Sequence, residues 1–402
     1  MKYNRLLLHS VLLILVGLAS AQFCVAYTAS SIGKERRIYV SNLDQLYAAV
    51  NNPDNTRTRI VLAPGNYVLS AAYPNGGRLE LQTDMTLQGQ PGKRDAVLID
   101  QSSLPNASFR LSPTVSVAGI RMGRGTNSLE WLAVKGGNLA ANPLSVIEPD
   151  LLGSETNVIF SHVYVDCNAS RTGILIRNRL AEHENRVINA TLEYSEIANA
   201  FVNPAPGAGL ALQNRIPGSQ IRLNMTGNYI HDNRIGILNF NSGLGNLVEN
   251  ARLDIRSHND VIDGNGCGLD LSGGSSGPGG PMSNENIVTV DMFAGSISDN
   301  GRPELTPTNG ALLSGMYLAG GYGSDNVSDN LLSISLRGCK ISNNGETDIY
   351  AYGAFSPNGV LAGTGNRLDL FLYGVSAFAS IESADSVPFE PAGTNVVNIV
   401  QN

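Results

Sequence analysis

One short pattern recurs along the second half of the chain, and it constrains the fold more than any other feature. A hydrophobic residue is followed by two others and then by Asn, in "VDCN", "IHDN", "IDGN", "ISDN" and "ISNN". The residues that open these segments are Val165, Ile230, Ile262, Ile297 and Ile341. A repeat every 20 to 50 residues or so predicts a stacked or radial architecture, in which each unit packs mainly on its neighbours.

Each repeat contains short strands and no helix. The text before the opening residue alternates in hydrophobicity, as in "ARLDIRSHNDVI" and "NIVTVDMFAGSI", and a second alternating segment follows, as in "GLDLS", "GMYLA" and "DIYAY". Period-two alternation predicts strands. The turns vary in length while the strands stay aligned, which favours parallel coils over propeller blades. We therefore predict an all-β solenoid, a single-stranded parallel β-helix of roughly ten coils.

The repeated Asn has a structural explanation in such a fold. Stacked coils repeat at about 4.8 Å, so amide side chains at the same place in successive coils can hydrogen-bond to one another. The sequence therefore predicts an asparagine ladder at a turn, and these Asn residues are not catalytic candidates.

An amphipathic segment at residues 41–51 precedes the coils. Ser41 and Asp44 resemble a capping box. The apolar side of the expected helix carries Leu43, Leu46, Tyr47 and Val50. Because the end coil of a solenoid exposes unpaired backbone groups, we expect this helix to cover the first coil.

The start of the chain is typical of an exported protein. Lys2 and Arg5 precede an apolar run that is too short to span a bilayer, and small residues near Ala21 and Ala26 offer cleavage sites. We predict a signal peptide at residues 1–26, with cleavage after Ala21 or Ala26 left open. The remaining residues, 27–402, should form one domain with regular coils at about 155–380. The expected location is extracellular or periplasmic, without a further membrane span.

Composition excludes several classes of function. The net charge is −7 and only 15% of residues are charged, so the basic surface of a nucleic-acid-binding protein is not expected. Cys167, Cys267 and Cys339 follow the predicted leader at wide spacing and without a CxxC motif. This pattern argues against a disulfide framework and a zinc site, and favours three buried thiols.

The segments "IYVSNLDQLYAAVNN" and "RIVLAPGNYVLS", followed by coils punctuated with Asn, resemble the right-handed parallel β-helix proteins of the pectate-lyase-like superfamily. The resemblance covers most of the chain, from about Arg37 onward. It implies a right-handed solenoid and, in members that are enzymes, a polysaccharide lying in a groove along the parallel strands. Lyases of that superfamily typically use calcium-binding acids and an Arg or Lys base, whereas its hydrolases use close carboxylates.

Aligning the first strand of each repeat brings charged residues together on the outward face. The alignment places Arg222 beside Asp254 and Arg256 beside Asp291, with His258 at the edge. As a catalytic site, Arg256 or His258 would accept a proton and an Asp would act as acid or cation ligand. As a structural feature, the same residues would form a cross-strand ladder of ion pairs. Two acids are few for a calcium site.

Aligning the second strand gives two neighbouring rows suited to sugars. Its outward residues combine tyrosine rings, which pack on C–H groups, with polar groups that meet hydroxyls. The candidate substrate-binding residues are Arg177, Asn239, Asn241, Asp270, Tyr317, Tyr350 and Tyr352. Exposed tyrosines also occur on strands simply because they fit a sheet.

Three functions remain in competition at this point. The first is a secreted protein that binds extracellular or cell-surface polysaccharide without catalysing a reaction. The second is a polysaccharide lyase or glycoside hydrolase acting on an acidic polysaccharide, and only the lyase would bring Ca²⁺ with it. The third is a structural surface protein or adhesin. We expect no other cofactor or metal, and the oligomeric state stays open.

Overall fold

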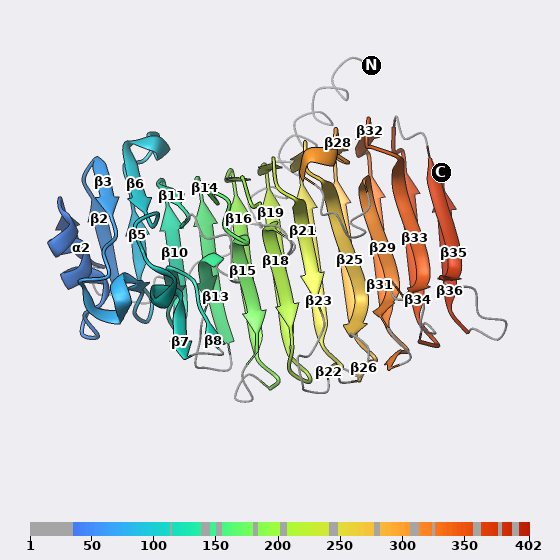
Figure 1. Ribbon diagram of the computed structural model, residues 1–402, viewed down its shortest axis with the longest axis horizontal. Helices are drawn as coiled ribbons and strands as arrows, with labels where there is room; N and C mark the ends of the chain where they lie inside the picture. Colours follow the sequence, from blue (N-terminus) through green and yellow to red (C-terminus); the bar gives the residue numbers. More distant parts are fainter. Residues whose placement is uncertain are drawn as a thin grey trace, which may run out of the picture. The chain divides into compact units, whose positions relative to one another are not determined.

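Three parallel β-sheets wind around a common core (Figure 1). The computed structural model describes residues 35–112, 115–137, 145–149, 155–179, 184–201, 207–240, 248–276, 282–305, 313–323, 326–356, 363–376, 380–387 and 394–402. The predicted signal peptide and Asn241 lie outside these residues. Within them, no helix is long and apolar enough to cross a membrane.

Each sheet takes one strand from most coils. Sheet 1 has twelve strands: β1 (Arg36–Val40), β2 (Thr58–Leu62), β5 (Thr86–Gln88), β10 (Gly125–Glu130), β13 (Glu155–Ser161), β16 (Val187–Glu193), β19 (Gln220–Thr226), β23 (Arg252–His258), β27 (Ile287–Phe293), β31 (Leu331–Arg337), β34 (Arg367–Tyr373) and β36 (Val396–Gln401). Sheet 2 has nine: β3 (Gly65–Val68), β6 (Val97–Asp100), β11 (Ala133–Lys135), β14 (Tyr164–Asp166), β17 (Glu196–Ala198), β20 (Tyr229–His231), β24 (Val261–Asp263), β28 (Ser296–Ser298) and β32 (Lys340–Ser342). Sheet 3 has ten: β4 (Leu79–Glu80), β9 (Ile120–Met122), β12 (Ser145–Pro149), β15 (Thr172–Asn178), β18 (Ala208–Asn214), β21 (Ile235–Phe240), β25 (Cys267–Ser276), β29 (Ser314–Gly323), β33 (Thr347–Phe355) and β35 (Ile381–Val387).

Short elements occupy the turns. A small parallel sheet joins β22 (Val248–Glu249), β26 (Ser283–Asn284) and β30 (Val327–Ser328), and β7 (Arg110–Ser112) pairs with β8 (Val115–Ser116). Single 3₁₀ turns lie at Pro74–Gly77, Arg94–Ala96, Asn106–Phe109 and Pro303–Leu305. The parallel β-helix predicted from the repeat is therefore confirmed.

The hydrophobic residue that opens each repeat is itself the centre of a strand of sheet 2. Ile230, for example, is the middle residue of β20 and pairs with Ile262 of β24. Such a strand has three residues and only one of them points inward, so it produces no readable alternation. This is why the sequence indicates two strands per repeat with clarity, whereas most coils have three.

The predicted asparagine ladder is confirmed. Asn233, Asn265, Asn300 and Asn344 are buried in successive coils, and each Nδ2 donates to the Oδ1 of the next at 3.0–3.1 Å. The Oδ1 atoms of Asn265, Asn300 and Asn344 also accept the backbone N–H of the Asn before them, and that of Asn233 accepts from Ala200. Asn168, of the "VDCN" segment, does not join them, because its Nδ2 donates to the carbonyl of Gly136.

A second ladder, which the repeat analysis did not anticipate, starts the strands of sheet 1. Asn286, Asn330, Asn366 and Asn395 are linked Nδ2 to Oδ1 in the same way, at 2.9–3.3 Å. The two ladders therefore stabilise two different corners of the coils.

Helix α2 (Leu43–Val50) lies at the β1 end of the solenoid (Figure 1). Its N-cap is Asn42, whose side chain accepts from the N–H of Gln45, while Gln45 Oε1 accepts from the N–H of Ser41. The predicted capping box is thus displaced by one residue. Leu46, Tyr47 and Val50 are buried as expected, and Leu43 packs on the core while partly exposed.

The three described cysteines are free and buried, as predicted.

Candidate functional site

The charged residues predicted on the first strand do lie side by side on the outer face of sheet 1. Arg222 of β19 pairs in register with Asp254 of β23, and Arg256 of β23 pairs with Asp291 of β27. They line a hollow of about 660 Å³, here called the sheet 1 hollow, together with Asn189 and Asn224. The alternation that buries Leu253 and Ile255 turns Asp254 and Arg256 outward.

Asp254 is fully engaged by its neighbours. Its carboxylate accepts from the Nε of Arg252 at 2.9 Å, from Gln220 Nε2 at 2.8 Å and from the hydroxyl of Thr289 at 2.6 Å. Partial burial raises the pKa of Asp254, but these hydrogen bonds outweigh it and hold the pKa below the usual range. Because its oxygens are occupied, Asp254 is poorly suited to abstract a proton or to ligate a cation.

Arg252 was not among the predicted residues, although it supplies this ion pair. It lies two positions before Asp254 on the same strand, at the very start of β23, where the alignment of first strands named no candidate. The predicted neighbour, Arg222, instead donates to Gln220 Oε1 at 2.9 Å.

Arg256 is the open cation of the sheet 1 hollow. It is exposed and makes no hydrogen bond or ion pair with the described chain. Asp291, its neighbour in register, has its Oδ1 3.6 Å from the Nε of Arg337, and both side chains are more than half exposed. Such a pair is weak in water, so Asp291 contributes little to fixing either arginine.

His258 does not join the charged group. Its ring stacks on Phe293 with centroids 5.3 Å apart, and it is not part of the hollow's lining. The interpretation of these residues as a structural ladder of ion pairs therefore fits Asp254. Arg222 and Arg256, in contrast, keep donors that a ligand could use.

The predicted sugar-binding row on sheet 3 is partly correct in register. Asp270, Tyr317 and Tyr350 are aligned, and Tyr352 pairs with Ala319 in the neighbouring row. Arg177 pairs with Gln213, and Gln213 pairs next with Phe240, whereas Asn241 lies outside the described residues.

Asn239 is misplaced by one residue in the predicted row. The partner of Ala211 is Leu238, so Asn239 pairs with Leu212 on the inward side. There it is buried and bonds the backbone of Ser272 through both ends of its amide, at 2.7 and 2.8 Å. Both faces of sheet 3 are buried and carry apolar residues, so hydrophobicity does not reveal which residue points inward, and a slip of one reverses the assignment.

The tyrosines of sheet 3 are closed to solvent, contrary to the expectation of an open sugar-binding face. Tyr317, Tyr350 and Tyr352 are 4%, 7% and 5% exposed and belong to a second apolar cluster with Leu175 and Leu238. In this state their ring faces are not available to a polysaccharide.

Asp270 lies next to this cluster and makes no hydrogen bond with the described residues. Burial raises its pKa from 3.8 to about 7. Its predicted role in binding substrate stays a prediction, and the titration is a separate property that can be measured.

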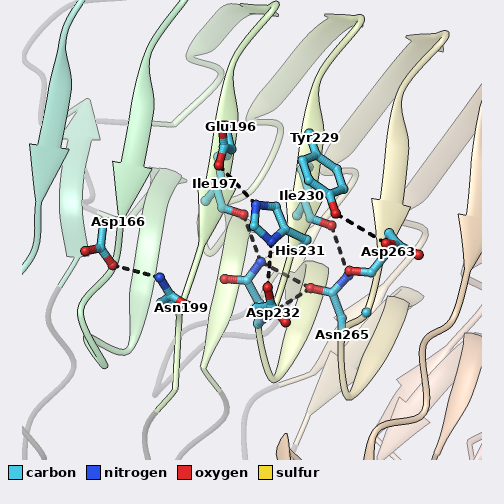
Figure 2. A network of polar contacts seen from close by, with 12 residues as sticks. Asp166, Glu196, Ile197, Asn199, Tyr229, Ile230, His231, Asp232, Asp263 and Asn265 are labelled. Carbon is cyan, nitrogen blue, oxygen red and sulfur yellow. Dashed lines mark hydrogen bonds and ion pairs between the residues drawn. The ribbon is translucent and has the colours of Figure 1, made fainter. Parts of the chain in front are cut away.

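Figure 2 shows a polar network on sheet 2 that the sequence analysis missed. The two ring nitrogens of His231 lie between carboxylates, with Nδ1 2.8 Å from Asp232 Oδ2 and Nε2 3.2 Å from Glu196 Oε1. The ring stacks on Tyr229 at 4.0 Å, and the Tyr229 hydroxyl donates to Asp263 at 3.3 Å.

Two arginines extend this network and balance its acids. Arg94 donates to the second oxygen of Glu196 at 2.8 Å, and Arg302 bonds both Asp232 and Glu304. The hydrogen bonds from His231 and Arg302 keep the pKa of Asp232 low although partial burial would raise it. Glu196 and Asp232 each meet cations, and Asp263 is held by the hydroxyls of Tyr229 and Ser298. We therefore interpret the network as a brace between coils. Aligning the triplets "EIA", "YIH" and "VID" would have revealed it.

Comparisons with known proteins add likenesses at low identity. No protein-family model and no curated protein sequence matches the chain. Among solved structures, it is similar to the A-module of mannuronan C-5 epimerase AlgE4 from Azotobacter vinelandii, with 15% identity and a TM-score of 0.45 over 90% of this chain and 91% of that one. The A-module of mannuronan C-5 epimerase AlgE6 from the same organism is 14% identical, with a TM-score of 0.32 over 86% of this chain and 95% of that one. Escherichia coli YbhC is 12% identical, with a TM-score of 0.36 over 68% of this chain and 74% of that one. Identities this low do not transfer an activity.

Among the described residues, no group of three or more His, Cys, Asp or Glu side chains is arranged to hold a metal ion.

Proposed function

We propose that the protein is a secreted β-helix that binds an acidic extracellular or cell-surface polysaccharide in the sheet 1 hollow, without cleaving it. The observation that carries the proposal is the open guanidinium of Arg256, which has no partner within the described chain and lies beside a carboxylate that other residues already neutralise. An anion in the hollow would find a donor that is otherwise bonded only to water.

The arrangement of donors supports a polymeric ligand. Arg222 and Arg256 lie on adjacent strands, two residues apart in register, and Asn224, two residues after Arg222, is the register partner of Arg256. Guanidinium groups bind carboxylates through two parallel hydrogen bonds, and amides serve hydroxyls. A chain of acidic sugars running across the strands could therefore use both cations.

The test is binding to immobilised polygalacturonate, alginate and a neutral glucan at two salt concentrations. We expect the acidic polymers to bind in low salt and to be released by high salt, because exposed charges are screened. Arg256→Ala should weaken binding about tenfold, since a lost charge-assisted hydrogen bond is worth about 1.5 kcal/mol or more.

Arg37→Gln is the matched control, because it removes an exposed arginine from β1, far along the same sheet. It should bind like the wild type. Equal binding of Arg256→Ala and wild type, or equal binding of neutral and acidic polymers, would refute the proposed site. Shortening of any polymer during the incubation, followed by chromatography, would show that the protein is an enzyme instead.

A further inference from the structure

The corner that follows sheet 1 carries an unusual series of residues in the left-handed conformation. Eight successive coils place a residue with positive φ at this point, and each donates its N–H to a carbonyl of the next coil. The series is Trp131, His162, Tyr194, Gly227, Asn259, Ala294, Gly338 and Gly374, with φ between 48° and 63°.

The first three members are large aromatic residues, which the turn does not require. Left-handed backbone is costly for any residue with a bulky side chain, and Gly or Asn normally fills it. The corner after sheet 2 largely obeys this rule, with Asn199, Asp232, Gly264, Asp299 and Asn343, and its one apolar exception among the described residues is the small Ala169. Residues held in unfavourable backbone geometry cluster at functional sites, so the three aromatic residues mark a candidate.

The three rings form one wall of a hollow. Trp131 stacks on His162 with centroids 3.7 Å apart, and His162 lies 5.1 Å from Tyr194. The hollow measures about 570 Å³, and residues 92–96 form its other wall. Tyr194 is 54% exposed. The next member, Gly227, has no side chain, and a Cβ there would lie 2.9 Å from the Tyr194 ring, so the glycine is needed to seat that ring.

Several donors of this aromatic hollow have no partner in the protein. Across the described residues, the indole N–H of Trp131, the hydroxyl of Tyr194 and the ammonium of Lys93 make no hydrogen bond or ion pair. Arg94, in contrast, is fixed in place by Glu196, which Figure 2 shows reaching His231, and by the ring of Tyr164 at 5.3 Å. Asp95 lies 3.3 Å from Arg94 but is largely exposed to water.

We propose that the aromatic hollow is a second carbohydrate-binding site, which takes a sugar unit bearing a carboxylate. The ring wall offers apolar surface for the C–H groups of a sugar, and the free N–H and O–H groups meet its hydroxyls. Lys93 and Arg94 supply positive charge for the carboxylate. The site is distinct from the sheet 1 hollow and does not depend on binding there.

The chain contains one tryptophan, so the fluorescence of Trp131 reports on this hollow alone. Oligogalacturonate, oligomannuronate and neutral cello-oligosaccharide would be titrated into the full-length secreted protein while its emission is recorded. We expect at least one acidic oligosaccharide to change the emission in a saturable way. Tyr194→Ala should weaken this titration roughly fivefold, and Lys93→Gln should weaken the acidic ligand more than the neutral one.

Ala294 occupies the equivalent turn position in a later coil, so Tyr194→Ala is expected to fold. The melting temperature of the variant checks this. Arg256→Ala separates the two sites, because it should impair capture by immobilised polymer and leave the tryptophan titration unchanged. Constant emission with every acidic oligosaccharide would overturn the second site, even if polymer capture persists. So would a titration that neither Tyr194→Ala nor Lys93→Gln alters, since the rings would then serve only to stack on one another.

Discussion

Replacing Asn265 by alanine is expected to lower the free energy of unfolding by about 4 kcal/mol, measured by denaturant titration. Asn265 is fully buried in the middle of the first ladder. Its Oδ1 accepts both the backbone and the side-chain N–H of Asn233, and its Nδ2 donates to the carbonyl of Ile230 and to Asn300. The shorter side chain would leave donors and acceptors on two neighbouring coils without partners, each at a cost of about 1–3 kcal/mol.

Asn224→Ala is the control for this loss. Asn224 has the same amide but is exposed on β19, without a hydrogen bond to the described chain. Its replacement should change the unfolding free energy by less than about 0.5 kcal/mol. Similar small losses in both variants would mean that water replaces the ladder's hydrogen bonds, and that apolar packing alone holds the coils in register.

The sequence predicted the first sheet well because that sheet has one apolar and one polar face. Alternation along "ARLDIRSH" identifies Asp254 and Arg256 as outward, and the repeat then gives their neighbours in the next coil. A shift of the strand pairing by one residue would put charged side chains into the core, so only one register is acceptable. The alignment could not show ion pairs between residues of the same strand. The ion pair expected between Arg222 and Asp254 is therefore made by Arg252 instead.

On the third sheet, alternation in hydrophobicity does not distinguish inward from outward side chains. Leu238 and Ile237 are adjacent and both buried, one toward the second apolar cluster and the other toward the main core. With two apolar faces the pattern has no polar reference, so Asn239 could be assigned to either side. The burial of Tyr317 was equally invisible, because alternation indicates the direction of a side chain and not whether another part of the molecule covers it.

The two candidate hollows differ in how far the sequence repeat could reveal their residues. The sheet 1 hollow consists of outward residues of strands, and the repeat found most of them. The aromatic hollow consists of corner residues, where successive coils share a backbone conformation and not a residue type. Trp131, His162 and Tyr194 become a series only when their N–H groups and φ angles are known.

Asp270→Asn is expected to make the protein more stable at pH 8 while leaving it nearly unchanged at pH 4. Burial raises the pKa of Asp270 to about 7 from 3.8, so the folded state retains a proton that the unfolded state has released. Stability from this group is complete below about pH 4, is lost as the pH rises toward 7, and changes little above that. The difference between a pKa of 3.8 and one of about 7 corresponds to about 4 kcal/mol at most. The asparagine amide does not ionise and escapes this loss.

Asp254→Asn serves as the opposite case in the same experiment, thermal or denaturant unfolding followed from pH 4 to pH 8. The pKa of Asp254 is lowered, because its hydrogen bonds to Arg252, Thr289 and Gln220 outweigh its partial burial. The charged form therefore stabilises the fold above the unfolded pKa, and the stabilisation is lost as the pH falls. Asp254→Asn should thus be less stable than the wild type at pH 8, whereas Asp270→Asn is more stable. If the two variants instead shift stability in the same direction at pH 8, Asp270 is hydrated in solution and the closed tyrosine cluster beside it is open, which would return Tyr317 and Tyr350 to the list of surfaces able to meet a sugar.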